Sequence, residues 1–350
     1  MHLFHSLKKL SRPSPATSLS IPPPTPPFST PSPWHVSLKP NRGSWNQIFG
    51  LLFLDNPIGV GFSIASTPEE IPRNQKDVAK HLYIAIKQFI KINASFKGRP
   101  IYIIGESYVR KYMPAIGYHA LKKNGKLRHV HSKVNLVGVV IGNGLTDPVS
   151  QVATHAANAY YIGLINDKQK RQLESLQAKA ISLAKKGYWS EATNARSEVL
   201  NTLKNMTGMA TSYNIRSKLV GEALHENLMK SVKYMVEFLV KNTKVLLYEG
   251  QLDLRVGIVS TEAWVKRMNW EGIDKFLEAD RKVWRVNSEL AGYVQKWGNL
   301  SHVVLLGAGH LVPHDQPLNS QAMIEDWVLE KGLFANDQIE NLSTNLANIL

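Results

Sequence analysis

Five short apolar runs most constrain what this chain can fold into, because each is uninterrupted and each ends in a turn containing Gly or Asp. The runs are Leu51 to Leu54, Ile101 to Ile104, Val134 to Ile141, Lys244 to Tyr248 and His302 to Leu306. Helical segments separate them. Continuous apolar runs indicate strands buried on both faces. The pattern predicts an α/β fold with a mostly parallel sheet and helices on both faces.

A block with helical character, at about residues 150–240, separates the third run from the fourth. Leu173, Leu176, Ala180 and Leu183 repeat at helical spacing after an Asn166-Asp167 start and before Gly187, which predicts an amphipathic helix. A second helix is expected from Ser190 to Met206. A helical block inserted between strands can form a lid over a site at the strand ends, or a layer that simply packs.

Composition excludes several classes of protein. Apolar residues make up 43% of the 350 residues, and no apolar run approaches the roughly 18 to 20 residues of a membrane span. The net charge of +15 is spread along the chain, and its densest cluster, at 122–133, surrounds an Asn124-Gly125 turn without interleaved aromatic residues. A solvated loop is the favoured interpretation, so no nucleic-acid partner is predicted. Without Cys there is no disulfide, thiolate metal site or Cys nucleophile.

Residues 1–33 differ in composition from the rest of the chain. They hold nine of the 18 prolines and no acid, which predicts a disordered leader that precedes a globular domain at 34–350. The leader has no apolar run long enough for a secretory signal peptide.

The segment from Pro100 to Tyr108 predicts a nucleophile. It is a strand that enters a tight turn with Ser107 at its apex, the context of a nucleophile elbow. A serine hydroxyl needs a His as general base and an acid that orients this His. Asp253 and His310 follow later runs, in the chain order of the α/β-hydrolases. We therefore expect Ser107, Asp253 and His310 to form a catalytic triad.

Several longer motifs resemble those of the plant-type serine carboxypeptidase-like proteins, family S10 of the α/β-hydrolases. They are Gly43-Ser-Trp-Asn46, Leu52-Phe-Leu-Asp-Asn-Pro-Ile-Gly-Val-Gly-Phe-Ser63, Ile104-Gly-Glu-Ser-Tyr108, Ile141-Gly-Asn-Gly-Leu-Thr-Asp147, Leu247-Tyr-Glu-Gly-Gln-Leu-Asp253 and Gly307-Ala-Gly-His-Leu-Val-Pro313. They span the chain from about Trp34 to Phe334.

The resemblance implies a hydrolase that releases C-terminal residues from peptides or proteins through an acyl-enzyme. It makes Ser107 the nucleophile, His310 the base and Asp253 its orienter. It assigns one oxyanion donor to the Tyr108 amide and a role in binding the terminal carboxylate to Glu106. It implies no cofactor and no metal.

The sequence also departs from the family pattern. The first family strands and their Gly-rich loop, which supplies the second oxyanion amide, are missing, so we expect an N-terminally truncated fold with an unpaired sheet edge. Val109 and Arg110 stand where the family has small residues behind the serine. Two alternatives therefore stay open beside the peptidase. One is an acyltransferase of the same family, although such relatives tend to carry Asp where this chain has Glu106. The other is a catalytically inactive peptide-binding remnant.

Four tripeptides match the N-glycosylation acceptor. They begin at Asn93, Asn205, Asn299 and Asn341. By family resemblance we expect a protein of the secretory pathway, vacuolar or extracellular.

Overall fold

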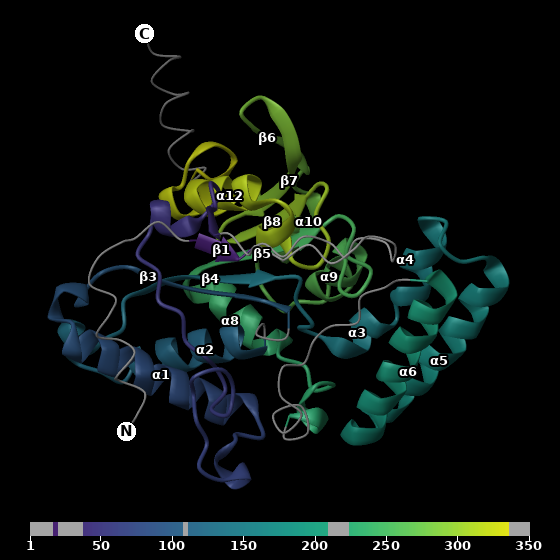
Figure 1. The fold of residues 1–350 in the computed structure, drawn as a ribbon, viewed down its shortest axis with the longest axis horizontal. Helices are drawn as coiled ribbons and strands as arrows, with labels where there is room; N and C mark the ends of the chain where they lie inside the picture. The colour runs from purple at the N-terminus through teal and green to yellow at the C-terminus, as the bar shows by residue number, and fades with distance from the viewer. Residues whose placement is uncertain (1–16, 20–37, 108–110, 209–223, 336–350) are drawn as a thin grey trace, which may run out of the picture.

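The sheet forms the centre of the molecule, which we describe from a computed structural model. The structure describes residues 17–19, 38–107, 111–208 and 224–335. Six strands pair in the order β3-β4-β5-β8-β7-β6 (Figure 1). These strands are β3 (Ile101–Glu106), β4 (Leu136–Gly142), β5 (Lys244–Gly250), β6 (Lys282–Val286), β7 (Glu289–Trp297) and β8 (Leu300–Leu305). Strands β3, β4, β5 and β8 are parallel neighbours, whereas β7 is antiparallel to both β8 and β6. The predicted α/β fold is confirmed.

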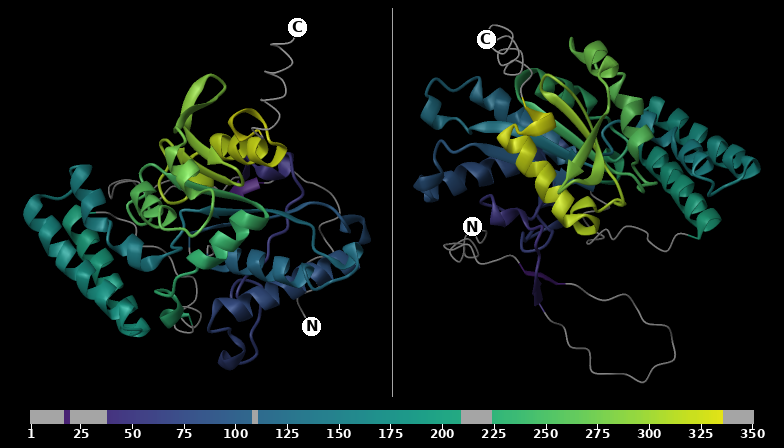
Figure 2. Two further views of the ribbon diagram at one scale, coloured as in Figure 1. Left: turned by 180° about the vertical axis from the view of Figure 1, so that it is seen from behind. Right: turned by 90° about the horizontal axis from the view of Figure 1, so that it is seen from above.

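Helices cover both faces of this sheet (Figures 1 and 2). The helices are α1 (Gln75–Ile92), α2 (Tyr112–Asn124), α3 (Pro148–Val152), α4 (His155–Tyr161), α5 (Asp167–Lys185), α6 (Trp189–Thr207), α8 (Lys233–Asn242), α9 (Ile258–Val265), α10 (Ile273–Glu278), α11 (Val312–Asp315) and α12 (Pro317–Leu329). Two buried clusters separate the layers. One packs α1, α2 and α8 against residues such as Val139 and Leu247, and the other packs α12 against Leu246 and Val303. Neighbouring strand residues point to opposite faces, so the continuous apolar runs reflect burial on both sides.

One of the five predicted strands is wrong. The run Leu51–Leu54 has no regular secondary structure. Trp45 and Phe49 pack with the α12 layer, whereas Leu54 packs with the α1 and α2 layer. The run therefore passes from one layer to the other instead of pairing. Within the described residues β3 is an edge strand of the six-stranded sheet, which agrees with the expected unpaired edge.

Helices α3 to α6 lie between β4 and β5 in the chain. Helix α5 begins at a reciprocal capping box, in which the Asn166 side chain accepts from the Gln169 amide and the Gln169 side chain accepts from the Asn166 amide. Leu173 and Ala180 are fully buried on its inner face, as their spacing predicts. Gly187 turns the chain into α6, and the two helices project together to one side of the sheet (Figure 2).

Most of the predicted leader lies outside the described residues. Its described part is strand β1 (Thr17–Leu19), which pairs antiparallel with β2 (Leu38–Pro40). Among all residues that the structure describes, no helix has both the length and the apolar character needed to cross a membrane.

Candidate functional site

Polar residues follow four neighbouring parallel strands at the same edge of the sheet. Ser107 follows β3, Asn143 follows β4, Asp253 follows the end of β5 and His310 follows β8. The carboxyl ends of parallel strands meet at one edge of an open α/β sheet, where such sheets bind their ligands. The fold therefore gathers these side chains although the sequence separates them widely.

Ser107 has a backbone conformation that few serines adopt. Its φ is 61°, in the left-handed region that costs a non-Gly residue free energy. Ser107 directly follows β3, and its positive φ is the strained conformation expected of the serine in a nucleophile elbow. Asn143, at the end of β4, also has a positive φ of 45°.

The structure brings the three predicted triad residues into one chain of hydrogen bonds. His310 Nε2 lies 2.7 Å from Ser107 Oγ, and His310 Nδ1 lies 2.6 Å from Asp253 Oδ2. A carboxylate accepts only, so a neutral His310 must carry its proton on Nδ1. Its Nε2 then carries the lone pair that can accept the Ser107 proton, which is the tautomer that a general base requires.

Asp253 is buried and held by several donors. Asn143 Nδ2 donates to Oδ2 at 2.5 Å, and the amides of Arg255 and Val256 donate to Oδ1 at 2.7 and 3.1 Å. Burial alone would raise the pKa of Asp253, but the hydrogen bonds from His310 and Asn143, with the charge of His310, hold it below its usual value. Asp253 therefore stays ionised and can stabilise a protonated His310. We did not single out Asn143 from the sequence, although a polar residue directly after a buried strand is a signal for it.

The two turns that carry Asp253 and His310 interlock. The amides of Gln251 and Leu252 donate to the carbonyls of Leu305 and Ala308, each at 2.9 Å. A Cβ on Gly250 would stand 2.0 Å from the Gly309 carbonyl oxygen, so only glycine allows this approach. The turns that carry Asp253 and His310 are thus fixed relative to each other by the backbone.

Glu106 lies beside the nucleophile in a poorly solvated position. Its Oε1 accepts from the Val312 amide at 3.0 Å and from the Tyr248 hydroxyl at 3.3 Å. Burial raises the pKa of Glu106 to about 7, and these two hydrogen bonds only partly oppose the rise. Near neutral pH this carboxyl can be protonated and can donate a hydrogen bond to an anion.

A second buried acid and histidine pair lies in the same sheet, and the sequence did not lead us to it. Glu249 Oε2 is 2.5 Å from His302 Nε2, and the Thr261 hydroxyl donates to Glu249 Oε1 at 2.8 Å. Both side chains of the pair are 1% exposed. Because the pair is shielded from solvent, it ties β5, β8 and α9 together rather than facing a substrate.

Lys111 anchors the start of α2, the helix that follows Ser107 in the chain. Its side chain is fully buried, and its Nζ donates to the carbonyl of Asn227 at 2.6 Å and to that of Lys230. The chain segment that leads into α8 is therefore fixed to the helix that follows Ser107.

Other predicted site residues have no structural account. Tyr108, Val109, Arg110 and Asn341 lie outside the described residues. Among the glycosylation candidates, Asn205 is exposed on α6. The Asn93 and Asn299 amides donate to the Phe89 and Val240 carbonyls.

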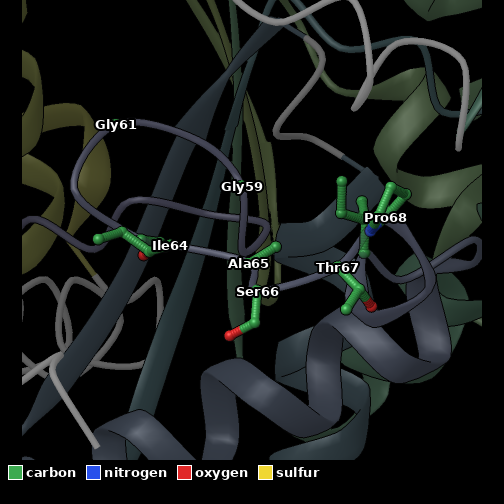
Figure 3. A pocket seen from close by; sticks show the side chains of 9 residues that line it. Gly59, Gly61, Ile64, Ala65, Ser66, Thr67 and Pro68 are labelled. Carbon is green, nitrogen blue, oxygen red and sulfur yellow. The ribbon is translucent and has the colours of Figure 1, made fainter.

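A pocket lies away from the triad. The loop from Gly59 to Ile71, including Ser63, Ile64 and Pro68, lines a cavity of about 420 Å³ (Figure 3). No triad residue is part of its lining. Within the described ranges no group of three or more His, Asp or Glu side chains is placed to hold a metal ion.

Comparisons with known proteins show the family to which this sequence is similar. The family model described as serine carboxypeptidase matches residues 27–222 and 195–330. The chain is 48% identical to serine carboxypeptidase-like 50 of Arabidopsis thaliana, over 89% of this chain and 78% of that protein. It is 31% identical to the probable serine carboxypeptidase CPVL of Homo sapiens, over 85% of this chain and 71% of that protein.

A solved structure shares the fold. It is the prohormone-processing carboxypeptidase Kex1 of Saccharomyces cerevisiae, with a TM-score of 0.74 and 22% identity. The match covers 84% of this chain and 76% of that structure, so it supports the α/β-hydrolase fold.

Proposed function

This chain belongs to the serine carboxypeptidase family, and from that premise we propose that it removes C-terminal residues from peptides with Ser107 as its nucleophile. The observation that carries the proposal is the hydrogen-bond chain from Ser107 through His310 to Asp253, at 2.7 and 2.6 Å. Peptides are the substrates that the family implies.

In the first half of the reaction Ser107 Oγ forms a bond to the carbonyl carbon of the last peptide bond. Its proton passes to His310 Nε2, and the ionised Asp253 stabilises the resulting imidazolium. The carbon–nitrogen bond then breaks, and His310 returns the proton to the leaving amine. The released product carries the original C-terminal carboxylate. The Tyr108 amide is the proposed oxyanion donor.

In the second half water hydrolyses the acyl-enzyme. His310 takes a proton from the water, whose oxygen bonds to the acyl carbon. When the ester bond breaks, this proton returns to Ser107 Oγ. Hydrolysis, rather than transfer to an alcohol, separates the peptidase from an acyltransferase of the same fold. Partition of the acyl group between water and an added alcohol measures the difference.

Glu106 is the proposed recognition group for the terminal carboxylate. Two carboxyl groups close together must share a proton, and the raised pKa of Glu106 lets it hold that proton near neutral pH. An ionised Glu106 would instead repel the substrate. The proposed peptidase activity therefore falls as the pH rises through about 7.

A fluorophosphonate probe tests the nucleophile. We expect the folded chain to be labelled, and we expect Ser107→Ala and His310→Ala to lose labelling. Ser66→Ala and His314→Ala, which change exposed residues, serve as controls and should keep it. A folded chain that takes no label would be the inactive peptide-binding remnant instead.

A peptide pair tests the specificity. A peptide with a free C-terminal carboxylate should lose its last residue, whereas the same peptide with an amidated C-terminus should not. Equal cleavage of both peptides would contradict the role of Glu106 but not that of Ser107.

Members of this family are generally proteins of the secretory pathway. A vacuolar or extracellular location and glycosylation at Asn93, Asn205, Asn299 and Asn341 are the corresponding proposals for this chain. Mass spectrometry of glycosidase-treated protein from a plant cell would test the four sites.

A further inference from the structure

A buried arginine lies in the helical block, and no carboxylate of the described residues pairs with it. Arg196, on the inner side of α6, is 2% exposed. Its Nε and Nη2 find no hydrogen-bond acceptor among the residues that the structure describes. Burial, and then the charge of Arg255, lower the pKa of Arg196 to about 9, so the guanidinium remains charged at neutral pH. An unpaired buried charge costs several kcal/mol, which a bound anion would offset.

The two unpartnered nitrogens indicate the shape of that anion. Nε and Nη2 lie on the same edge of the planar guanidinium, where their two N–H groups are nearly parallel. This edge matches the two oxygens of a carboxylate, which accept both hydrogen bonds at once. A spherical ion such as chloride cannot match both donors as well.

Within residues 38–107, 111–208 and 224–335, the surroundings of Arg196 supply positive charge and no unpaired buried carboxylate. His155, on α4, is buried, and its pKa is lowered to about 3 by burial and then by the charge of Arg196, so it is neutral. Arg255 follows β5 and adds a second positive charge. Asp253 already accepts hydrogen bonds on both of its oxygens. The α6 carboxylates do not help, because Glu191 is exposed and Glu198 pairs with Lys179 on the outer side.

We propose that Arg196 binds a small carboxylate, of formate or acetate size, between the helical block and the turn that follows β5. Because Arg196 is 2% exposed, we restrict the proposal to ligands of this small size. The inference does not rest on the proposed peptidase function. It gives the site a structural consequence, because α4 contacts the turn that begins at Asp253: a Cβ on Gly257 would lie 3.8 Å from Asn158 Nδ2. A bound carboxylate would link α6 to the turn that carries the catalytic acid.

Thermal unfolding of the full chain tests the site. Sodium acetate is compared with sodium chloride at equal pH and ionic strength. We expect acetate to raise the Tm of the unaltered protein by about 2 °C more than chloride does, because a ligand that binds only the folded state stabilises it. Arg196→Gln should remove this difference, since it removes the charged fork. Arg171→Gln, an exposed arginine on α5 paired with Asp167, should keep it.

A second measurement does not depend on whether the variant folds. Saturation-transfer NMR on the unaltered protein should show magnetisation transfer to the acetate methyl protons, and formate should compete it away while chloride should not. The proposal is overturned if acetate and chloride give the same Tm without transfer, if chloride competes as well as formate, or if Arg196→Gln keeps the acetate effect.

Discussion

Strand β3 belongs to a sheet whose strands are held very differently from the segment near Leu51–Leu54. On the inner side of β3 lie β4, β5 and β8, whose turns bring Asn143, Asp253 and His310 together through backbone and side-chain hydrogen bonds. By contrast, the segment near Leu51–Leu54 has no regular secondary structure, and Phe53 and Phe62 are 84% and 87% exposed.

The proposed chemistry has two requirements, which are proton transfer and stabilisation of the substrate. Ser107, Asp253 and His310 each follow a parallel strand of one sheet, β3, β5 and β8. Of the proposed substrate-binding groups, Glu106 ends β3 and accepts hydrogen bonds from Val312 and Tyr248, whereas Tyr108 lies outside the described residues. Proton transfer and substrate stabilisation can therefore be tested separately.

The largest expected effect concerns the hydrogen-bond chain of Ser107, His310 and Asp253. Asp253→Asn should lower turnover by about 10⁴-fold, because an amide can no longer hold His310 in the required tautomer or stabilise its positive charge. Steady-state kinetics on a peptide measures the loss. The exposed carboxylate Asp274 provides the control, since Asp274→Asn should leave turnover unchanged. A small effect of Asp253→Asn would mean that the triad does not carry the reaction.

Glu106→Gln should change how stability depends on pH. The pKa of Glu106 is raised from 4.5 to about 7 in the folded protein, so folding keeps a proton that the unfolded chain has lost. Stability therefore falls as the pH rises between these values, by up to about 3 kcal/mol at pH 8. The variant should recover this stability at pH 8 and gain nothing at pH 4, as urea unfolding would show. Glu278→Gln, at an exposed site, should leave the profile unchanged.

Asn143→Gly should have a moderate effect on activity. Glycine tolerates the φ of 45°, so the variant removes the hydrogen bond to Asp253 without straining the backbone. We expect turnover to fall by roughly 10-fold, the cost of one hydrogen bond to a charged group. Asn287→Gly changes an asparagine with a similar φ of 50° in the turn between β6 and β7, far from the site. An equal loss in both variants would assign the effect to the backbone.

The smallest effect is expected in the segment near Leu51–Leu54. Phe53→Ser should change the free energy of unfolding by less than about 0.5 kcal/mol, because the ring has little contact to lose. Leu247→Ala, at a buried position within β5, should lower the free energy of unfolding by roughly 2 to 5 kcal/mol. A large cost for Phe53→Ser, measured by the same unfolding curves, would show that this segment packs against something in solution.

Sequence patterns predicted the elements whose signals are local. The apolar runs gave β3, β4, β5 and β8, and the Asn166 cap with Gly187 gave the bounds of α5 within two residues. The run Leu51–Leu54 carries the same signal, but a strand also needs a neighbour, and no local pattern reports whether one is present. Strands β6 and β7 were not predicted, because they are partly exposed and lack a continuous apolar run.

The site divides in the same way. Ser107, Asp253 and His310 could be proposed because each follows a strand in a recognisable order. The Glu249 and His302 pair could not, because Glu249 directly follows one apolar run, His302 begins another, and nothing local shows that the two side chains meet between β5 and β8. Arg196 looks like any exposed helical arginine until the packing of α6 is known.

The interlocked turns after β5 and β8 also determine how the site can open. The Gln251 amide bonds to the carbonyl of Leu305, at the end of β8, and the Leu252 amide bonds to that of Ala308, in the His310 turn, so the two turns cannot separate without breaking these bonds. The two turns should therefore open as one cooperative unit, and their amide protons should exchange with solvent at a common rate. In any one molecule, Asp253 and His310 are then either both placed for their hydrogen bond or both displaced.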